Sequence, residues 1–293
     1  MKKLLAVVIS ILALATLVGC GGETSASNPN LPTPAPASGA PAPAAPNPTQ
    51  PLSGNVLLNG STSVERVVAS LIEAFNMEHP DVILTFNPTG SGAGITSAIE
   101  GTADIGLSSR TLRETETGVD YIVFAIDGIA LFAHPDNPIQ DLTVEQIAGI
   151  YTRQITNWSE VGGNDAPIAV FGREAGSGTR DAFESILGIG DDVSYDQEHT
   201  SGGAILAAVS TNPFGIGYAS ISAVGDGVRL VAVNGVPCTE QTLIDGRYEV
   251  QRPFIMMTQS GAEISPAAQA FIDFALNPDS AWIIENAGVI QAR

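Results

Sequence analysis

Residues 172–180 read Gly-Arg-Glu-Ala-Gly-Ser-Gly-Thr-Arg. An apolar run at 168–171 precedes this stretch, and a helix-like run at 181–187 follows it. This order predicts a strand, a glycine-rich turn and the start of a helix. Because the first amides of a helix lack intrahelical partners and carry the positive end of the helix dipole, such a turn favours a bound anion.

Side chains in this stretch strengthen the prediction of an anion site. Ser177 and Thr179 offer hydroxyl donors, and Gly178 lets a bound group approach the backbone. Arg173 and Arg180 bring guanidinium forks that fit oxyanion oxygens. A capped helix start with surface arginines is the alternative for this stretch taken alone.

Two further stretches have the same character. Residues 59–63, Asn-Gly-Ser-Thr-Ser, follow a strand-like run at 56–58 and precede a helix-like run, with Thr62 and Glu65 spaced as a capping box. Residues 89–94, Thr-Gly-Ser-Gly-Ala-Gly, also lie between a strand-like and a helix-like run. Three such turns predict one ligand held by several helix N-termini.

Together these features resemble the PstS family, the phosphate-binding lipoproteins that feed bacterial phosphate ABC transporters. Six motifs carry the resemblance in the family's order, and they span the chain after its proline-rich segment. They are residues 60–63 (Gly-Ser-Thr-Ser), 90–92 (Gly-Ser-Gly), 103–110 (Ala-Asp-Ile-Gly-Leu-Ser-Ser-Arg), 125–130 (Ala-Ile-Asp-Gly-Ile-Ala), 176–180 (Gly-Ser-Gly-Thr-Arg) and 215–218 (Gly-Ile-Gly-Tyr).

The resemblance implies a two-lobed α/β fold of the periplasmic-binding-protein type II class, with the ligand in the cleft between the lobes and two hinge crossings. It places lobe I at residues 55–128 and 252–293 and lobe II at residues 129–251. Alternating strand-like and helix-like runs independently predict α/β lobes with largely parallel sheets. Further expected elements are strands at 103–107, 121–126 and 129–132, a short helix capped by Thr143 to Gln146, and a late helix started by Ser265 and Pro266.

The N-terminus reads as a lipoprotein signal peptide over residues 1–19. Lys2 and Lys3 precede an apolar run at 4–18, which is shorter than the ~20 residues of a membrane-spanning helix. It ends in a lipobox-like Leu-Val-Gly-Cys, so Cys20 is expected to carry a lipid that anchors the chain to the cell membrane, outside the cytoplasm. A transmembrane anchor and an ordinary signal peptide are the alternatives.

Residues 20–54 follow as a Pro/Ala-rich tether. They hold almost no large apolar residue, so they cannot bury a core. We expect a semi-rigid spacer that gives the anchored lobes reach, with a partner-binding role as the alternative.

The charge of the chain excludes several classes of partner. Of its 12 basic residues, Lys2 and Lys3 are the only lysines, which leaves 10 arginines against 31 acidic residues and a net charge of −21 once the signal peptide is removed. Such a chain repels nucleic acid, and it also repels an anion at long range. Anion binding must therefore rest on short-range dipoles and a few buried arginines.

Neither a metal site nor a cofactor is predicted. The chain lacks CxxC, HExxH and clustered His/Cys patterns. With Cys20 lipidated, Cys238 has no cysteine partner and is expected to be a buried or incidental thiol. His199 lies two residues before a Ser-Gly-Gly helix start at 201–203, where contact with a ligand stays open.

By resemblance, both lobes contact the oxyanion between them. Ser109 holds the position of the carboxylate with which family members accept the proton of phosphate, so Asp127 or a hydroxyl lone pair would take that role. The expected contacts are Ser61, Thr62, Ser63, Ser91, Ser108 and Ser109 from lobe I, and Arg173, Ser177, Gly178 and Thr179 from lobe II. The second-rank candidates are Arg110, Asp127, Arg180 and Ser201.

The implied partners are inorganic phosphate and the membrane permease of a phosphate ABC transporter, and we expect a monomer. Sulfate or molybdate is the main alternative ligand. A phosphatase or serine hydrolase built on Ser177 is weaker, because Glu174 stands where a GxSxG elbow has its first glycine and no His/Asp partner is suggested. An adhesive surface lipoprotein is suggested only by the tether. We therefore expect a binding protein and not an enzyme.

Overall fold

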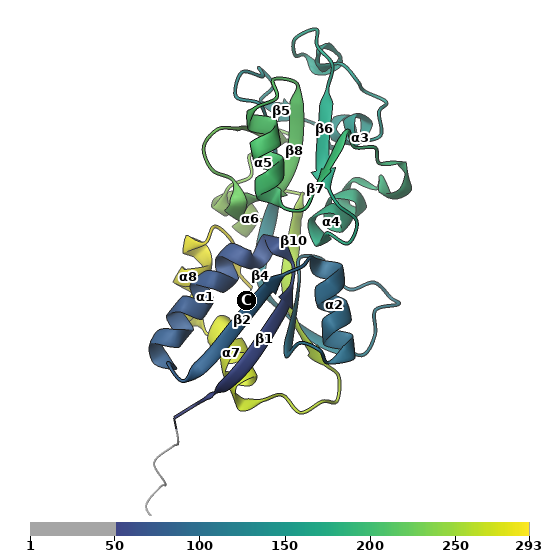
Figure 1. Ribbon diagram of the computed structural model, residues 1–293. Coiled ribbons are helices and arrows are strands. Elements are labelled where there is room, and N and C mark those ends of the chain that lie inside the picture. Colours follow the sequence, from purple (N-terminus) through teal and green to yellow (C-terminus); the bar gives the residue numbers. More distant parts are fainter. Residues whose placement is uncertain (1–50, 293) are drawn as a thin grey trace, which may run out of the picture. The chain divides into compact units, whose positions relative to one another are not determined.

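The computed structural model describes residues 51–292, and residues 1–50 and 293 lie outside the described part. The predicted signal peptide, the lipidation at Cys20 and most of the tether fall outside the described residues. Within the described part, the chain forms two α/β lobes, called lobe I and lobe II, which are joined by two long strands (Figure 1). No helix in this part is long and apolar enough to cross a lipid bilayer.

Lobe I combines residues from both ends of the described chain. Its sheet has the strand order β2-β1-β3-β10-β4, and a short C-terminal strand, β11, also pairs with β4. The strands are β1 (Gly54–Gly60), β2 (Val82–Pro88), β3 (Ile105–Ser108), β4 (Val119–Ala133), β10 (Gln251–Gln259) and β11 (Ile290–Gln291).

Helices cover both faces of this sheet. The helices are α1 (Glu65–Glu78), α2 (Ser91–Glu100), α7 (Pro266–Leu276) and α8 (Ala281–Asn286). On α1 the apolar residues Val67, Leu71 and Phe75 recur at helical spacing and are buried against α7 and α8. The rings of Phe75 and Phe271 pack edge to face, with 5.4 Å between their centroids. On the other face, α2 packs Ile95 against β10.

Lobe II is built on the second half of β4. Its strands are β5 (Asp141–Leu142), β6 (Ala169–Arg173), β7 (Gln197–His199), β8 (Gly215–Ser220) and β9 (Arg229–Val233), and its helices are α3 (Val144–Tyr151), α4 (Gly178–Leu187), α5 (Gly202–Ser210) and α6 (Glu240–Ile244). Its core is separate from that of lobe I and contains Tyr151, Phe183 and Tyr218, with the last two rings stacked at 4.0 Å.

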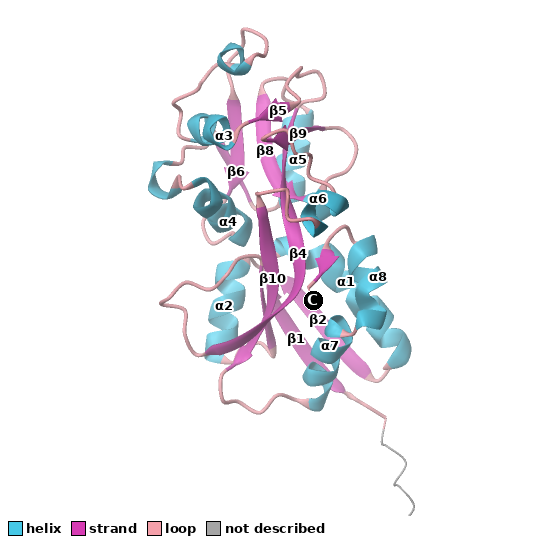
Figure 2. Cartoon of the chain, turned by 180° about the vertical axis from the view of Figure 1, so that it is seen from behind, coloured by secondary structure: helices cyan, strands magenta, loops and turns pink. Residues whose placement is uncertain are grey.

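Strand β4 runs unbroken between the lobes. Residues 119–128 pair with β10, whereas residues 129–133 pair with β8. The predicted division into one strand at 121–126 and another at 129–132 is wrong, because Asp127 and Gly128 continue the pairing with β10. Gly128 allows close packing at this point, since a Cβ there would lie 2.6 Å from Cys238 Sγ. Seen from behind, β4 and β10 run side by side through the junction of the lobes (Figure 2).

The prediction of largely parallel sheets is also wrong. β1 runs parallel to β2 and β3, and β6 runs parallel to β7 and β8, as predicted. However, β10 is antiparallel to both β3 and β4, and β4 is antiparallel to β8 and β9. The two strands that cross between the lobes run in opposite directions, so they place antiparallel pairs at the centre of the fold.

Several local predictions are confirmed. Thr143 and Gln146 form a capping box at α3, and Ser265 caps α7 with Pro266 in its first turn. Cys238 is buried in the core of lobe II, and burial raises the pKa of its thiol to about 12. A thiol in this state is not an activated nucleophile.

Candidate functional site

The three glycine- and serine-rich turns meet at the junction of the lobes. Ser61 is the N-cap of a 3-10 turn, Thr62–Val64, which leads into α1. Ser91 is the first residue of α2, and Ser177 is the N-cap of α4. The predicted capping box of Thr62 and Glu65 is wrong: the Ser61 hydroxyl caps this turn by accepting from the Ser63 amide, and Thr62 is left free for another contact.

Three buried serines of lobe I form one cluster. The Ser61 hydroxyl donates to Ser109 Oγ at 2.8 Å, and the Ser91 and Ser109 hydroxyls lie 3.3 Å apart. Ser91 Oγ also accepts from the Ser109 amide at 3.0 Å, which fixes the turn after β3 against the start of α2. Polar groups buried this completely require partners, so the cluster is suited to share its hydrogen bonds with a bound anion.

Lobe II closes directly over this cluster through Gly178. A Cβ at Gly178 would lie 2.1 Å from Ser91 Oγ and 2.7 Å from Ser109 Oγ, so only glycine fits here. The backbone amide of Gly92 donates to the Gly176 carbonyl at 3.1 Å, which also spans the two lobes. The predicted ligand contacts of lobe I and lobe II are therefore brought together in space.

Arg173 lies at the end of β6 and is buried, with 1% of its surface exposed. Its Nη2 donates across the junction to Thr62 Oγ1 at 3.0 Å, and its Nε and Nη2 both bind the Glu174 carboxylate, at 2.9 and 2.8 Å. Nη1 makes no hydrogen bond within the described part of the chain. Arg173 thus contacts the lobe I turn at Thr62 through Nη2, and Glu174 balances its charge.

A second buried guanidinium, Arg252 on β10, was missed in the sequence. Its Nη1 donates to Ser109 Oγ at 3.1 Å and to the Ser109 carbonyl at 3.2 Å. Its Nε and Nη2 donate to Asp127 Oδ2 at 3.0 and 2.9 Å. The only sequence signal was the position of Arg252 at the expected return crossing, because no motif around it indicates a ligand.

Both carboxylate oxygens of Asp127 already accept hydrogen bonds within the protein. Arg252 occupies one of its oxygens, and the Ser220 hydroxyl donates to the other at 2.6 Å. Burial raises the pKa of Asp127 and lowers that of Arg252, and the attraction between the two groups opposes both shifts. We assign an ion pair here, because the carboxylate receives two guanidinium hydrogen bonds and one hydroxyl hydrogen bond.

Other predicted site residues have local roles. The Ser108 hydroxyl bonds the backbone of Arg110, Ser201 caps α5, and Arg180 binds Glu184 and Glu198 within lobe II. The His199 carbonyl, and not its ring, accepts from Arg173. These side chains therefore do not join the serine cluster.

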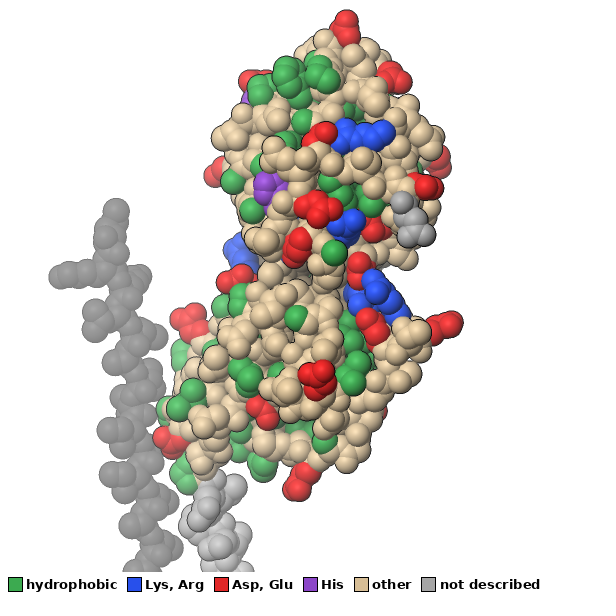
Figure 3. Space-filling model, turned by 45° about the vertical axis from the view of Figure 1, so that its right-hand side comes forward, with side chains coloured by type: hydrophobic (Ala, Val, Ile, Leu, Met, Phe, Trp, Pro, Cys, Tyr) green, Lys and Arg blue, Asp and Glu red, His purple; other side chains and the backbone are tan. Residues whose placement is uncertain are grey.

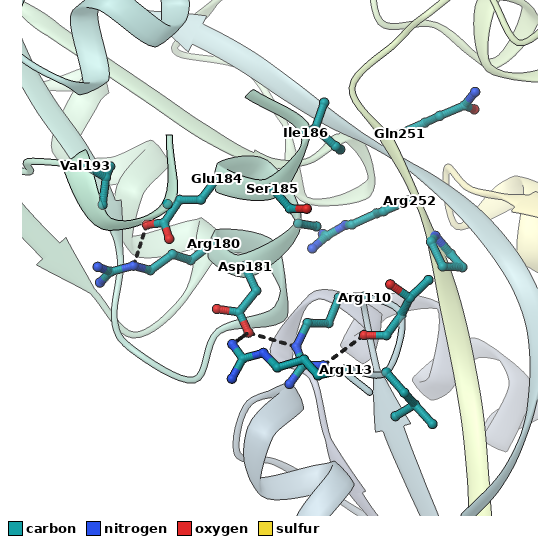
Figure 4. Close-up of a pocket in the computed structure, with 15 residues that line it drawn as sticks. Arg110, Arg113, Arg180, Asp181, Glu184, Ser185, Ile186, Val193, Gln251 and Arg252 are labelled. Carbon is teal, nitrogen blue, oxygen red and sulfur yellow. Dashed lines mark hydrogen bonds and ion pairs between the residues drawn. The ribbon is translucent and has the colours of Figure 1, made fainter. Parts of the chain in front are cut away.

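A cluster of opposite charges lies between the lobes. It lines a cavity of about 730 Å³ with arginines from both lobes, and Figure 4 shows the contacts of these arginines with acidic side chains. Asp181 on α4 lies 2.8 Å from both Arg110 Nε and Arg113 Nη2 of lobe I, and Arg110 also holds Glu116 at 2.6 Å. Figure 3 shows acidic side chains spread over the visible face, whereas the basic side chains lie mostly near the narrow junction of the lobes, with a further basic patch in the upper lobe.

Hydroxyls, amides and guanidinium groups such as those at this junction can bind a tetrahedral oxyanion. The Ser177 hydroxyl accepts from the Arg180 amide at 3.4 Å, and within the described residues it makes no hydrogen bond to a histidine or a carboxylate. An activated serine needs such a base within hydrogen-bond reach.

Comparison with known proteins supports the assignment of this junction as an oxyanion-binding site. The model of the PBP superfamily domain matches residues 45–279. One similar crystal structure is that of a phosphate ABC transporter substrate-binding protein from Clostridium perfringens, solved with bound phosphate. Its sequence is 41% identical to this chain, the match covers 82% of this chain and 100% of that one, and the TM-score is 0.78.

An ABC-type phosphate transport receptor from Vibrio cholerae is 34% identical over 81% of this chain and 100% of its own, with a TM-score of 0.70. The phosphate-binding protein PstS of Borreliella burgdorferi is 28% identical over 81% of this chain and 90% of its own. The predicted two-lobed fold and the resemblance are thereby confirmed: this chain belongs to the PBP superfamily and, within it, to the PstS family.

Proposed function

We propose that this protein is an extracytoplasmic solute-binding protein that captures inorganic phosphate between its lobes and delivers it to an ABC-type phosphate importer. One observation carries the proposal: donors from both lobes meet at one buried point, where Gly178 closes on the Ser61, Ser91 and Ser109 cluster. The phosphate-binding relatives from Clostridium perfringens and Vibrio cholerae support the choice of ligand.

The proposed ligand contacts follow from this geometry. They are Ser61, Thr62, Ser63, Ser91, Ser109, Arg173, Ser177, Gly178 and Thr179. Ser108 is left out because its hydroxyl is engaged with the Arg110 backbone. A charge-assisted hydrogen bond contributes roughly 1.5–3 kcal/mol, and micromolar binding needs about 8 kcal/mol. Four or five good contacts therefore suffice, even after the costs of closure are met.

We further propose that lobe I comprises residues 55–128 and 252–293 and that lobe II comprises residues 129–251. The two cores support this division, because Ala125 and Phe254 lie in the core of lobe I, whereas Ile129 and Val250 lie in that of lobe II. The hinge would then consist of β4 near Gly128 and the start of β10.

The protein would act as a binding protein and not as a phosphate-ester hydrolase. Turnover of a chromogenic phosphate ester that is lost in Ser177→Ala would contradict this view. The lipid anchor at Cys20 and the monomeric state remain proposals that rest on the sequence. If the anchor exists, Cys20→Ser releases the chain from the membrane fraction and leaves phosphate affinity unchanged, because the tether separates the lipid from the lobes.

Isothermal titration of the purified protein with phosphate tests the function. We expect Arg173→Ala to weaken binding at least about 100-fold, because loss of one partner of a buried charged contact costs several kcal/mol. Arg173→Lys should restore little, since an ammonium cannot form the fork.

Arg153→Ala is the control, because Arg153 pairs with Asp196 inside lobe II and touches no proposed contact. Circular dichroism verifies that each variant is folded. An Arg173→Ala variant that binds phosphate as tightly as the wild type would refute the proposed site.

A further inference from the structure

The backbone of Arg173 is held at both its amide and its carbonyl by side chains of lobe II. The amide donates to the Tyr218 hydroxyl at 3.3 Å, and the carbonyl accepts from Arg180 Nη1 at 3.0 Å. Arg173 ends β6 and Arg180 lies on α4, so the second bond spans the turn between these two elements. The direction in which the Arg173 side chain leaves β6 is therefore set from two sides.

The side chains that hold this backbone are themselves joined at Glu184. Oε1 of Glu184 accepts from Arg180 Nε at 2.7 Å and from the Tyr195 hydroxyl at 3.0 Å, and the hydroxyls of Tyr195 and Tyr218 lie 3.0 Å apart. A closed ring of hydrogen bonds results, which we call the Arg173 brace; its members are Arg173, Tyr218, Tyr195, Glu184 and Arg180. Figure 4 shows the bond between Arg180 and Glu184.

Donors and acceptors alternate around the Arg173 brace without conflict. The Tyr195 hydroxyl donates to the Glu184 carboxylate, so it accepts from the Tyr218 hydroxyl, which in turn accepts from the Arg173 amide. Burial raises the pKa of both tyrosines, so both hydroxyls keep their protons. Because this chain of bonds ends at a charged acceptor, its members strengthen one another.

Packing holds the Tyr195 ring independently of its hydroxyl. A Cβ at Gly172, the residue before Arg173, would lie 2.1 Å from Tyr195 Cε1, so the ring packs on the backbone where only glycine fits. The Arg180 guanidinium lies over the same ring, with 5.0 Å from Cζ to the ring centroid. Removal of the hydroxyl alone therefore opens the Arg173 brace and leaves this packing in place.

We propose that Glu184 and Tyr195 are positioning residues, which close the Arg173 brace and thereby keep the Arg173 guanidinium aimed at the bound oxyanion. This inference rests on the proposed capture of phosphate by Arg173. A side chain that is held in place before the ligand arrives loses little conformational freedom on binding, so the affinity rises. Neither Glu184 nor Tyr195 is a proposed contact, so an effect of either on affinity must pass through another residue.

A double-mutant cycle, measured by isothermal titration with phosphate up to millimolar concentration, tests this role. We expect Tyr195→Phe to weaken phosphate binding about tenfold in the wild-type protein, the size expected for the loss of a buried hydrogen bond. In the Arg173→Ala background the same change should cost less than about twofold, because the side chain that it misplaces is already gone. A purely structural role would cost the same factor in both backgrounds.

Glu184→Gln is a second variant that disturbs the packing even less. Its amide oxygen can still accept from Tyr195, but it lacks the charge that holds Arg180, so we expect about threefold weaker binding in the wild type and no change in the Arg173→Ala background. The matched control is Tyr248→Phe, which removes a hydroxyl that donates to the Ile129 carbonyl at 2.9 Å in the core of lobe II. It should lower the unfolding temperature much as Tyr195→Phe does and leave the phosphate affinity unchanged.

The outcomes separate this inference from the proposed function. Wild-type protein that does not bind phosphate overturns the proposed function, and the inference with it. If the wild type binds phosphate, the inference alone is overturned when Tyr195→Phe binds it equally tightly, or when this change costs the same factor with and without Arg173. If Tyr195→Phe does not fold, Glu184→Gln decides by the same two comparisons.

Discussion

The hydroxyl oxygens of Ser63 and Thr179 lie 2.6 Å apart, although these residues belong to opposite lobes. Both are proposed ligand contacts, and the bond from Arg173 to Thr62 spans the lobes in the same way. Closure of the lobes and binding of the ligand therefore use the same groups. Substitutions that hinder closure of the lobes should therefore weaken the binding of the ligand.

Gly178→Ala should weaken phosphate binding at least about 100-fold. The added Cβ would lie 2.1 Å from Ser91 Oγ, so the lobes would have to stay apart, and the lost contacts would each cost roughly 1.5–3 kcal/mol. Isothermal titration measures the affinity, and thermal unfolding should be nearly unchanged because an open arrangement relieves the clash.

Gly225→Ala is the control for this variant, since a Cβ at Gly225 meets nothing within 4 Å. Equal affinities of the Gly178→Ala variant and the wild type would show that the lobes do not need this close approach.

Arg113→Ala should speed the release of phosphate up to about fivefold. Arg113 bridges the lobes through Asp181 at 2.8 Å, but its side chain is 62% exposed, and exposed ion pairs contribute only about 0.2–1 kcal/mol. Stopped-flow measurement of the dissociation rate tests this expectation. Arg247→Ala removes a similarly exposed arginine, 58% exposed, which pairs with Asp245 inside lobe II, and it should leave the rate unchanged.

Acid should weaken the ion pair of Arg110 and Glu116 in lobe I. The hydrogen bond from Arg110 lowers the pKa of Glu116 below its ordinary value of 4.5. A carboxylate with a depressed folded-state pKa stabilises the fold above its unfolded pKa, and this contribution is lost as the pH falls through the folded value. The unfolding temperature of wild type minus that of Glu116→Gln should therefore be positive near neutral pH and shrink as the pH falls below about 4. A difference that stays constant over this range would contradict the assignment.

Added salt should leave phosphate affinity nearly unchanged or raise it slightly. Arg173, Ser91 and Ser109 are buried, whereas the acidic surface that repels the anion is exposed and is screened beyond a Debye length of ~8 Å. Titration from low to physiological ionic strength should show mainly a faster association rate. A fall in affinity of about tenfold or more would place the anion on an exposed positive patch instead.

The sequence predicted the structure correctly where the preferences of neighbouring residues determine it. Strand, glycine-rich turn and helix follow one another at Gly178 as predicted, because small residues and helix N-caps have strong local preferences. It was misleading at Thr62, where the spacing to Glu65 suggests a cap but the hydroxyl accepts from Arg173 across the junction. A tertiary partner here outweighs the local motif.

Arg252 could not be identified as part of the site from the sequence. Its contact with Ser109 depends on β10 lying between β3 and β4, and strand order is set by long-range pairing that no neighbouring residue reveals. The same holds for the gap predicted between the strands at 121–126 and 129–132, where β4 is continuous and Gly128 packs close to Cys238.

The position of β10 also determines when the sheet of lobe I can be completed during folding. This strand comes from residues 251–259, yet it is the piece that joins β3 to β4 inside lobe I. A chain that emerges N-terminus first therefore exposes two unfinished sheet edges until nearly all of it has been made. Such edges pair readily with other chains, so this protein should depend on chaperones before it folds more than a protein whose domains are contiguous.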